Sequence, residues 1–331
     1  MTSLPRPELR NVGLVVAILA LAPLPVLGAT YYQGLLVHIL VVALFAAGLN
    51  VVFGHTDQLF LFTGGIAGVG AYGTALLADW LGVTAWVTLV LAALIAGLIG
   101  LAVSWISAKR NLTVVLIAIL TLNLQIVLHE IFVGARDLTG GSTGFAYDYL
   151  SIGSMAEVAG VGKKVVVYYL LLVLLLVVLV GYISLIRSKA GVAFEAIRED
   201  ELAAESIGVD VVRYKSLAGF LAAFVIGFTG PFVAAGSGYL LPGEFSFLAV
   251  DVLVLIVLVI GGLRTTLGPI VGAVVIVVVE EFLATVASNW QSAIFGALLI
   301  LLFLYFQDGI VRALRHRFDE LGIGSATETA D

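Results

Sequence analysis

Long stretches without Asp, Glu, Lys or Arg are the feature of this sequence that most constrains its fold. Such stretches include residues 83–108, 165–186, 216–235 and 290–306. A helix needs about 20 apolar residues to cross the hydrocarbon core of a bilayer. Only a helix satisfies its backbone polar groups there without neighbouring strands, whereas a transmembrane barrel shows short alternating segments. The pattern predicts an all-α integral membrane protein built as a polytopic helical bundle.

Composition supports the same class. Hydrophobic residues make up 61% of the chain and charged residues 11%, whereas a soluble domain carries about 25% charged residues. The chain has no cysteine, which excludes disulfides, thiol nucleophiles and thiolate metal sites. A net charge of −6 without a basic cluster argues against nucleic acid as a partner.

Hydrophobic runs bounded by charges and turn residues predict about ten transmembrane helices. They lie near residues 11–30, 34–53, 59–78, 83–107, 111–133, 165–186, 216–236, 247–263, 266–287 and 290–306. The expected membrane domain therefore covers residues 11–306, followed by a polar tail over residues 307–331. The glycine-rich third run either crosses fully or is re-entrant. The first run resembles a secretory signal, but we expect it to stay as a helix because many spans follow.

Positive charge predicts the orientation of these helices. With the N-terminus inside, the inner segments hold Arg6, Arg10, Lys109, Arg110, Arg187, Lys189, Arg198, Arg213, Lys215, Arg264, Arg312, Arg315 and Arg317. The outer segments hold only Arg136, Lys163 and Lys164. This bias obeys the positive-inside rule. It predicts that both termini are cytoplasmic, and it requires the third run to cross the membrane.

The inner loop over residues 187–215 has the pattern of a cytoplasmic helix–turn–helix. Ser188 is placed to cap a short helix that ends at Gly208, and Asp210 to cap a second one. An apolar stripe recurs at helical spacing over Ala193, Ile197, Ala204 and Ile207. Small residues at its centre would let a soluble partner approach closely.

Ala203, Ala204 and Gly208 in this loop resemble the EAA-type coupling loop of ABC importer permeases, in which two alanines precede a glycine by four residues. Leu202 occupies the position of that pattern's glutamate, and Glu201 lies one position earlier. The longer phrase over residues 196–208, with residues 213–215, resembles the LivM-type permease family of branched-chain amino acid transporters.

Three further motifs carry the same resemblance, which spans roughly residues 45–285. They are residues 54–59 before the glycine-rich run, residues 138–141 in the outer loop, and residues 261–265 with Gly268, Pro269 and Gly272. The family implies an ATPase-coupling role for Arg198, Glu199, Glu201, Ala203, Ala204 and Gly208. It also implies a second related permease, two ATP-binding subunits, an external solute-binding protein, and a location in the cell's plasma (inner) membrane.

The sequence lacks the phosphate-binding motif G-x-x-x-x-G-K-[ST]. We therefore expect no cofactor in this chain and no enzymatic activity, with ATP and Mg bound by the partner ATPase subunits. The expected substrates are branched-chain, hydrophobic amino acids. A permease for urea or short amides, and a stand-alone secondary carrier, remain as alternatives.

Candidate substrate-path residues are Gly64, Gly65, Gly68 and Asp251. Ionisable groups within a membrane are functional candidates by default, and Asp251 would either pair with Arg136 or face a cavity. The glycines favour close helix packing, although an unwound segment there would offer backbone amides to a substrate carboxylate. Gly140 and Gly141 would either contact the solute-binding protein or form an ordinary turn. The four histidines are too isolated for a metal site.

Overall fold

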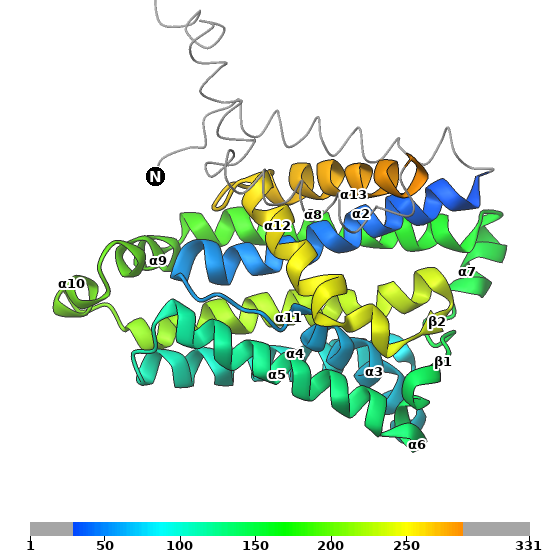
Figure 1. Ribbon diagram of the computed structural model, residues 1–331, viewed down its shortest axis with the longest axis horizontal. Coiled ribbons are helices and arrows are strands. Elements are labelled where there is room, and N and C mark those ends of the chain that lie inside the picture. The colour runs from blue at the N-terminus through cyan, green and yellow to red at the C-terminus, as the bar shows by residue number, and fades with distance from the viewer. Residues whose placement is uncertain (1–28, 287–331) are drawn as a thin grey trace, which may run out of the picture.

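The computed structural model describes residues 29–286, which are mostly α-helical (Figure 1). Within this part of the chain, six helices are long and apolar enough to cross a membrane. They are α2 (Thr30–Leu49) with its π-helical continuation η2 (Asn50–Gly54), α4 (Ala85–Lys109), α5 (Val114–Gly134), α8 (Lys163–Arg187), α11 (Val211–Ser237) and α13 (Gly268–Val286). Each matches one predicted run, which confirms the helical membrane bundle.

Two other predicted runs form elements outside this set of six. Residues 59–78 correspond to α3 (Thr63–Leu81), which starts after an irregular segment over residues 57–62. Residues 247–263 correspond to the π-helix η5 (Phe247–Asp251) and its continuation α12 (Val252–Gly261). The predicted helix over residues 290–306, the tail over residues 307–331 and nearly all of the run at 11–30 lie outside the described residues.

The two long loops lie at opposite ends of the bundle, as predicted (Figure 1). One end carries α9 (Lys189–Glu199) and α10 (Glu201–Ser206); we call it the α10 end. The other, the α7 end, carries α6 (Arg136–Thr139), η3 (Gly141–Thr143), β1 (Phe145–Ala146) and α7 (Ile152–Ala159). There β1 pairs antiparallel with β2 (Tyr239–Leu240), which precedes the 3-10 helix η4 (Pro242–Phe245).

Helix α11 lies against α3 and α4 along most of its length. Small residues permit this contact: a Cβ on Gly70 of α3 would collide with the backbone of Gly227 in α11, and a Cβ on Gly100 of α4 would collide with Gly219 and Ala223. Close approach of helix backbones is the usual basis of packing in membranes, where the hydrophobic effect between helices is lost.

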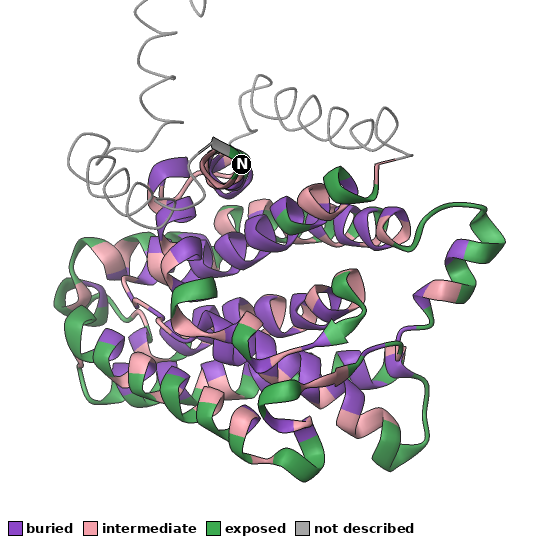
Figure 2. Ribbon diagram, turned by 45° about the vertical axis from the view of Figure 1, so that its right-hand side comes forward, coloured by how far each residue is buried: buried purple, intermediate pink, exposed green. Residues whose placement is uncertain are grey.

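The outward faces of α5 and α8 are apolar and exposed (Figure 2). On α5 they include Val115, Leu116, Ile119, Ile126, Val127 and Ile131, and on α8 Val173, Val177 and Val180. A water-facing surface would not hold such continuous stripes. These faces are suited to contact lipid or another membrane subunit.

Candidate functional site

The start of α3 lies inside the bundle. The Leu61 amide donates to Thr121 Oγ1 at 3.0 Å, and the Gly65 amide donates to Gln125 Oε1 at 2.5 Å. Gln125 lies about 16 Å along α5, which is about 31 Å long. The chain therefore leaves the α10 end as an irregular segment and becomes helical near the middle of the bundle. From there α3 runs to the α7 end (Figure 1), so the glycine-rich run passes from one end to the other.

Asp251 holds the first turn of α3. Its Oδ1 accepts from the Thr63 amide at 2.5 Å and its Oδ2 from the Gly64 amide at 3.4 Å. The Asp251 side chain is buried, with 1% of the residue exposed. The first amides of any helix lack partners within the helix, and a negative group there also interacts favourably with the helix dipole.

A second bridge joins the start of η5 to the same place. Gln125 donates through Nε2 to the Phe245 carbonyl at 2.7 Å, while its Oε1 receives the Gly65 amide. The segments that begin α3 and η5–α12 thus meet inside the bundle, and the two helices run toward opposite ends. We call this meeting point the helix junction; it comprises residues 61–65, Thr121, Gln125 and residues 245–251.

The junction differs from expectation in one respect. Asp251 bonds to backbone amides rather than to Arg136, which lies in α6 at the α7 end. The amides of Thr63, Gly64 and Gly65 are already held by Asp251 and Gln125. In this conformation they are not available to a substrate carboxylate.

The predicted glycines of α3 pack closely against other elements. A Cβ on Gly64 would lie 2.5 Å from the Phe245 carbonyl oxygen, and one on Gly65 would lie 2.8 Å from Gln125 Oε1. A Cβ on Gly68 would collide with the Phe132 ring. Close packing, the favoured interpretation of this spacing, is therefore what the structure shows.

Two predicted motifs, residues 54–59 and residues 261–265, meet at the α10 end. The Arg264 amide donates to Asn50 Oδ1, and Arg264 Nε donates to the Gly54 carbonyl, both at 2.8 Å. Arg264 Nη2 lies 3.9 Å from Asp57 Oδ1. Burial raises the pKa of the Asp57 carboxyl, and the positive charge of Arg264 opposes that rise.

Asn50 is the centre of this contact, although nothing in its sequence context marks it. Its Nδ2 donates to the Thr265 carbonyl at 3.2 Å and to Tyr182 Oη at 3.1 Å. The Tyr182 hydroxyl also lies 2.7 Å from His55 Nε2. One buried amide therefore ties α2, α8 and the segment after α12 together.

Replacing Asn50 by alanine should lower the free energy of unfolding by about 1–3 kcal/mol, because the partly buried Arg264 amide and Thr265 carbonyl lose their partner. Thermal melting of the purified protein in one detergent measures this. Asn123→Ala is the matched control, since Asn123 is exposed on α5 and bonds only to the Ile119 carbonyl of its own helix. Equal melting of the two variants would contradict the role given to Asn50.

The predicted coupling loop is helical but broken. Asp200 adopts an extended conformation between α9 and α10, and its side chain accepts from the Ala203 amide at 3.0 Å. The sequence predicts one helix from Ser188 to Gly208, and that prediction is wrong. Ser188 caps α9 as expected, but Asp210 caps the long helix α11 itself rather than a second short helix. Gly208 follows α10 with a φ of +89°.

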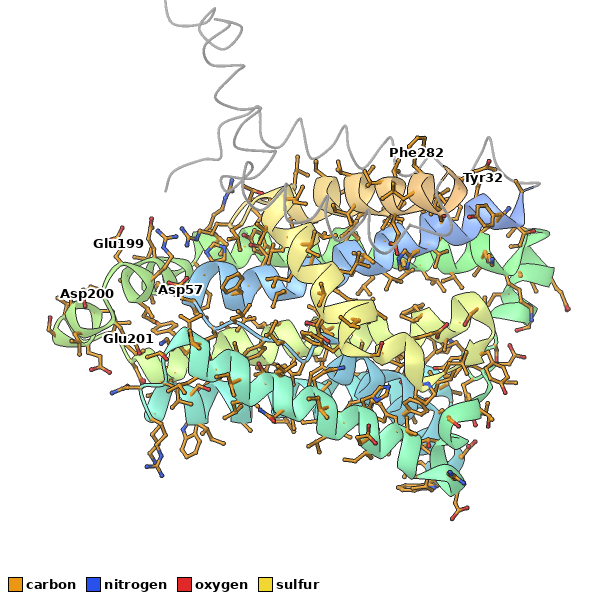
Figure 3. All side chains as sticks on the ribbon, in the orientation of Figure 1. Tyr32, Asp57, Glu199, Asp200, Glu201 and Phe282 are labelled. Carbon is orange, nitrogen blue, oxygen red and sulfur yellow. The ribbon has the colours of Figure 1, made fainter. Side chains whose placement is uncertain are left out.

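Exposure divides the loop residues into two groups. Ala193, Ile197 and Ala204 are buried, as the stripe predicts, but Ile207 is 76% exposed, as is Leu202. Glu199, Ala203 and Gly208 are exposed, and Arg198 and Glu201 are half-buried. Figure 3 shows Glu199, Asp200 and Glu201 at the extreme of the α10 end.

A chain of polar contacts leads from this loop to the irregular segment before α3. Glu201 pairs with Lys215 Nζ at 2.5 Å, and the Lys215 side chain is only 8% exposed. The Lys215 carbonyl accepts from Gln58 Nε2 at 3.2 Å. Gln58 is fully buried and lies in the irregular segment that runs into α3. These contacts connect α10 to the segment that enters the helix junction.

Gly140 and Gly141 form a tight turn at the α7 end. Both have a positive φ, of +71° and +62°, which glycine adopts without strain. A Cβ on Gly140 would collide with the Gly144 backbone.

Glu280 and Glu281 lie near the α7 end of α13, where Tyr31 donates to Glu281. Within residues 29–286, no three His, Asp or Glu side chains cluster as a metal site requires.

Comparison with known proteins decides the family. The family model described as branched-chain amino acid transport system / permease component matches residues 31–303. The chain belongs to this permease family. The matched region of this permease contains the helix junction, the Asn50 contact and the predicted coupling loop.

Two curated proteins named "High-affinity branched-chain amino acid transport system permease protein LivM" are similar to this permease. The one from Salmonella typhimurium is 29% identical and the one from Escherichia coli 30% identical, each over 288 residues. In both cases the match covers 81% of this chain and 67% of the relative. No solved structure matches significantly.

Proposed function

We propose that this chain is the permease subunit of an ATP-driven importer that moves branched-chain amino acids across the cell membrane. The observation that carries the proposal is the family match over residues 31–303. Two relatives whose names state high-affinity branched-chain amino acid transport support the substrate class. The permease is a transport subunit, and the chemistry of ATP hydrolysis belongs to its partners.

The α10 end is the cytoplasmic face in this proposal. Among the described residues it holds Lys109, Arg110, Arg187, Lys189, Arg198, Arg213, Lys215 and Arg264. The α7 end holds Arg136, Lys163 and Lys164. The positive-inside rule favours this orientation. We extend the proposal to both termini, which would then be cytoplasmic in a plasma (inner) membrane protein.

Helices α9 and α10 dock a separate ATPase subunit that holds ATP and Mg. The exposed Leu202 and Ile207 offer apolar contact, and the small residues Ala203 and Gly208 beside them leave room for close approach. Arg198, Glu199 and Glu201 supply charge around this surface. The complete assembly contains two ATPase subunits, a second related permease and an external solute-binding protein that meets the Gly140–Gly141 turn.

Force from the ATPase reaches the helix junction through Glu201, Lys215 and Gln58. These residues form a continuous series of contacts from α10 to the irregular segment that precedes α3. Because α3 and α12 both start at the junction, a shift there alters both halves of the bundle. The substrate path then runs beside Gly64, Gly65, Gly68 and Asp251.

Uptake by the assembled complex tests the proposal. Proteoliposomes with this permease, its partner permease, the ATPase subunits and the solute-binding protein should accumulate radiolabelled leucine only when ATP is present. Urea should not be accumulated. Accumulation of urea but not leucine would favour a urea or amide permease. Full uptake by this chain alone without ATP would establish a secondary carrier instead.

A further inference from the structure

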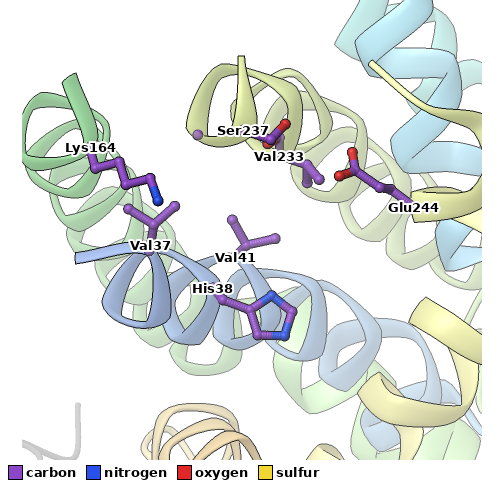
Figure 4. A pocket seen from close by; sticks show the side chains of 9 residues that line it. Val37, His38, Val41, Lys164, Val233, Ser237 and Glu244 are labelled. Carbon is purple, nitrogen blue, oxygen red and sulfur yellow. The ribbon is translucent and has the colours of Figure 1, made fainter. Parts of the chain in front are cut away.

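A cavity of about 220 Å³ lies between α2, α8 and α11 at the α7 end, and its lining residue Glu244 directly precedes the junction residue Phe245. It is lined by Gly34, Val37, His38, Val41, Lys164, Val233, Gly236, Ser237 and Glu244 (Figure 4). This volume corresponds to about seven water molecules in the liquid. The cavity is thus of a size for a small solute.

Opposite charges face this cavity from two sides. Lys164 approaches it from α8, and Glu244 from η4, between α11 and η5 (Figure 4). Lys164 and Glu244 do not form an ion pair with each other. Among the described residues, the ion pairs within 4 Å are Lys215–Glu201 and Arg264–Asp57. A solute that carries both charges is complementary to these two groups.

Each charged group has unused bonding capacity. Lys164 Nζ donates to the Thr30 carbonyl at 3.3 Å, and an ammonium has three donors. Oε2 of Glu244 is buried and has no hydrogen-bond partner among the described residues. A buried acceptor without a partner is costly, and burial raises the pKa of Glu244, which lies outside the spanning helices, to about 7.

The rest of the lining consists largely of aliphatic side chains and of glycines that leave space between them. Val37 and Val41 of α2 and Val233 of α11 form an aliphatic wall. Glycines keep the space free: a Cβ on Gly34 would lie 2.9 Å from Lys164 Nζ, and one on Gly236 would lie 3.3 Å from Val37 Cγ1. An aliphatic side chain bound there would contact these valines.

We propose that this cavity is a binding site for the zwitterion of a branched-chain amino acid near the external face. Glu244 binds the α-ammonium group, Lys164 binds the α-carboxylate, and Val37, Val41 and Val233 contact the aliphatic side chain. The assignment deepens the proposed function and rests on it for the substrate class and the orientation. It also explains selectivity, because urea carries neither charge.

Single-cysteine labelling tests occupancy, since the natural chain has no cysteine. Val233→Cys in the assembled permease–ATPase complex, without the solute-binding protein, is treated with a small thiol reagent. Leucine at about ten times its Kd should slow labelling about tenfold, because only the empty fraction reacts. Val37→Cys repeats the measurement from α2. Val158→Cys on α7, where Val158 is 92% exposed, should label at the same rate with and without leucine.

Charge variants test how the solute is recognised. In the Val233→Cys background, Glu244→Gln and Lys164→Gln should each raise the leucine concentration needed for protection at least tenfold. Leucinamide, which has no carboxylate, should be insensitive to Lys164→Gln but sensitive to Glu244→Gln. Lys163→Gln is the matched control, because Lys163 packs against Gly153 of α7 outside the cavity.

The outcomes separate this site from the proposed function. Normal ATP-driven leucine uptake with no protection at either cysteine would overturn the site and leave the function standing. Equal effects of Lys163→Gln and Lys164→Gln would also overturn it. Absence of leucine uptake by the unmodified complete assembly would instead reject the proposed function.

Discussion

Replacing Asp251 by alanine should lower the free energy of unfolding by about 2–4 kcal/mol, since the buried amides of Thr63 and Gly64 would lose their acceptor. Asparagine at this position keeps one acceptor oxygen, so Asp251→Asn should lower the free energy of unfolding less than Asp251→Ala does. Melting temperatures of the purified variants in one detergent measure the effect. The loss is large because Asp251 is only 1% exposed, and unsatisfied amides at a buried position are costly.

Asp137→Ala is the control for this comparison, because Asp137 is exposed in α6 at the α7 end. Surface substitutions of this kind usually change stability by less than about 0.5 kcal/mol. If Asp251→Ala had the same melting temperature as Asp137→Ala, the stability of the junction would not depend on Asp251. Leucine uptake by the stable Asp251→Asn variant then reports on transport separately from folding.

Gly208→Trp should reduce ATP-dependent uptake on the order of a hundredfold while membrane insertion stays intact. Gly208 is exposed at a φ of +89°, and no neighbouring group lies within 4 Å of the position that a Cβ would occupy. A tryptophan there would stand on the surface that we assign to the ATPase. Uptake in proteoliposomes and co-purification of the ATPase subunit measure the two consequences, loss of transport and loss of docking.

Gly160→Trp is the matched control for backbone strain. Gly160 is also exposed with a positive φ, of +67°, and it follows a short helix at the opposite end of the bundle. A residue with a Cβ in this left-handed backbone conformation costs about 1–2 kcal/mol at either position. If both variants lost uptake equally, strain alone would explain the result and the docking role of Gly208 would be rejected.

The long helices are predictable because their signal is local. The sequence predicts spans over residues 83–107 and 165–186, and the structure has Ala85–Lys109 and Lys163–Arg187. The apolar pattern places the start of α11 too late, at 216, because it takes charge to mark the membrane boundary. The helix instead begins at Val211, because its N-cap, Asp210, precedes the apolar run. A helix can extend outside the apolar run as far as its capping residue.

The junction is not predictable, because its contacts join distant residues. Asp251 stands out in the sequence as an unusual charge, but its partners lie 188 and 187 positions away. Asn50 looks like one polar residue in an apolar run, and its bond to Arg264 spans 214 positions. The break at Asp200 has a local signal, the capping of Ala203, but the apolar stripe that continues past it favours an unbroken helix.

The distance in sequence between Asp251 and the start of α3 also bears on biogenesis. The amides of Thr63 and Gly64 emerge from the ribosome long before the carboxylate that receives them. Unsatisfied backbone groups are poorly tolerated in lipid, so the nascent α3 must wait in a protected or hydrated place until most of the chain has been made. Assembly of this protein therefore finishes late, and a truncation before residue 251 leaves the third hydrophobic run without its anchor.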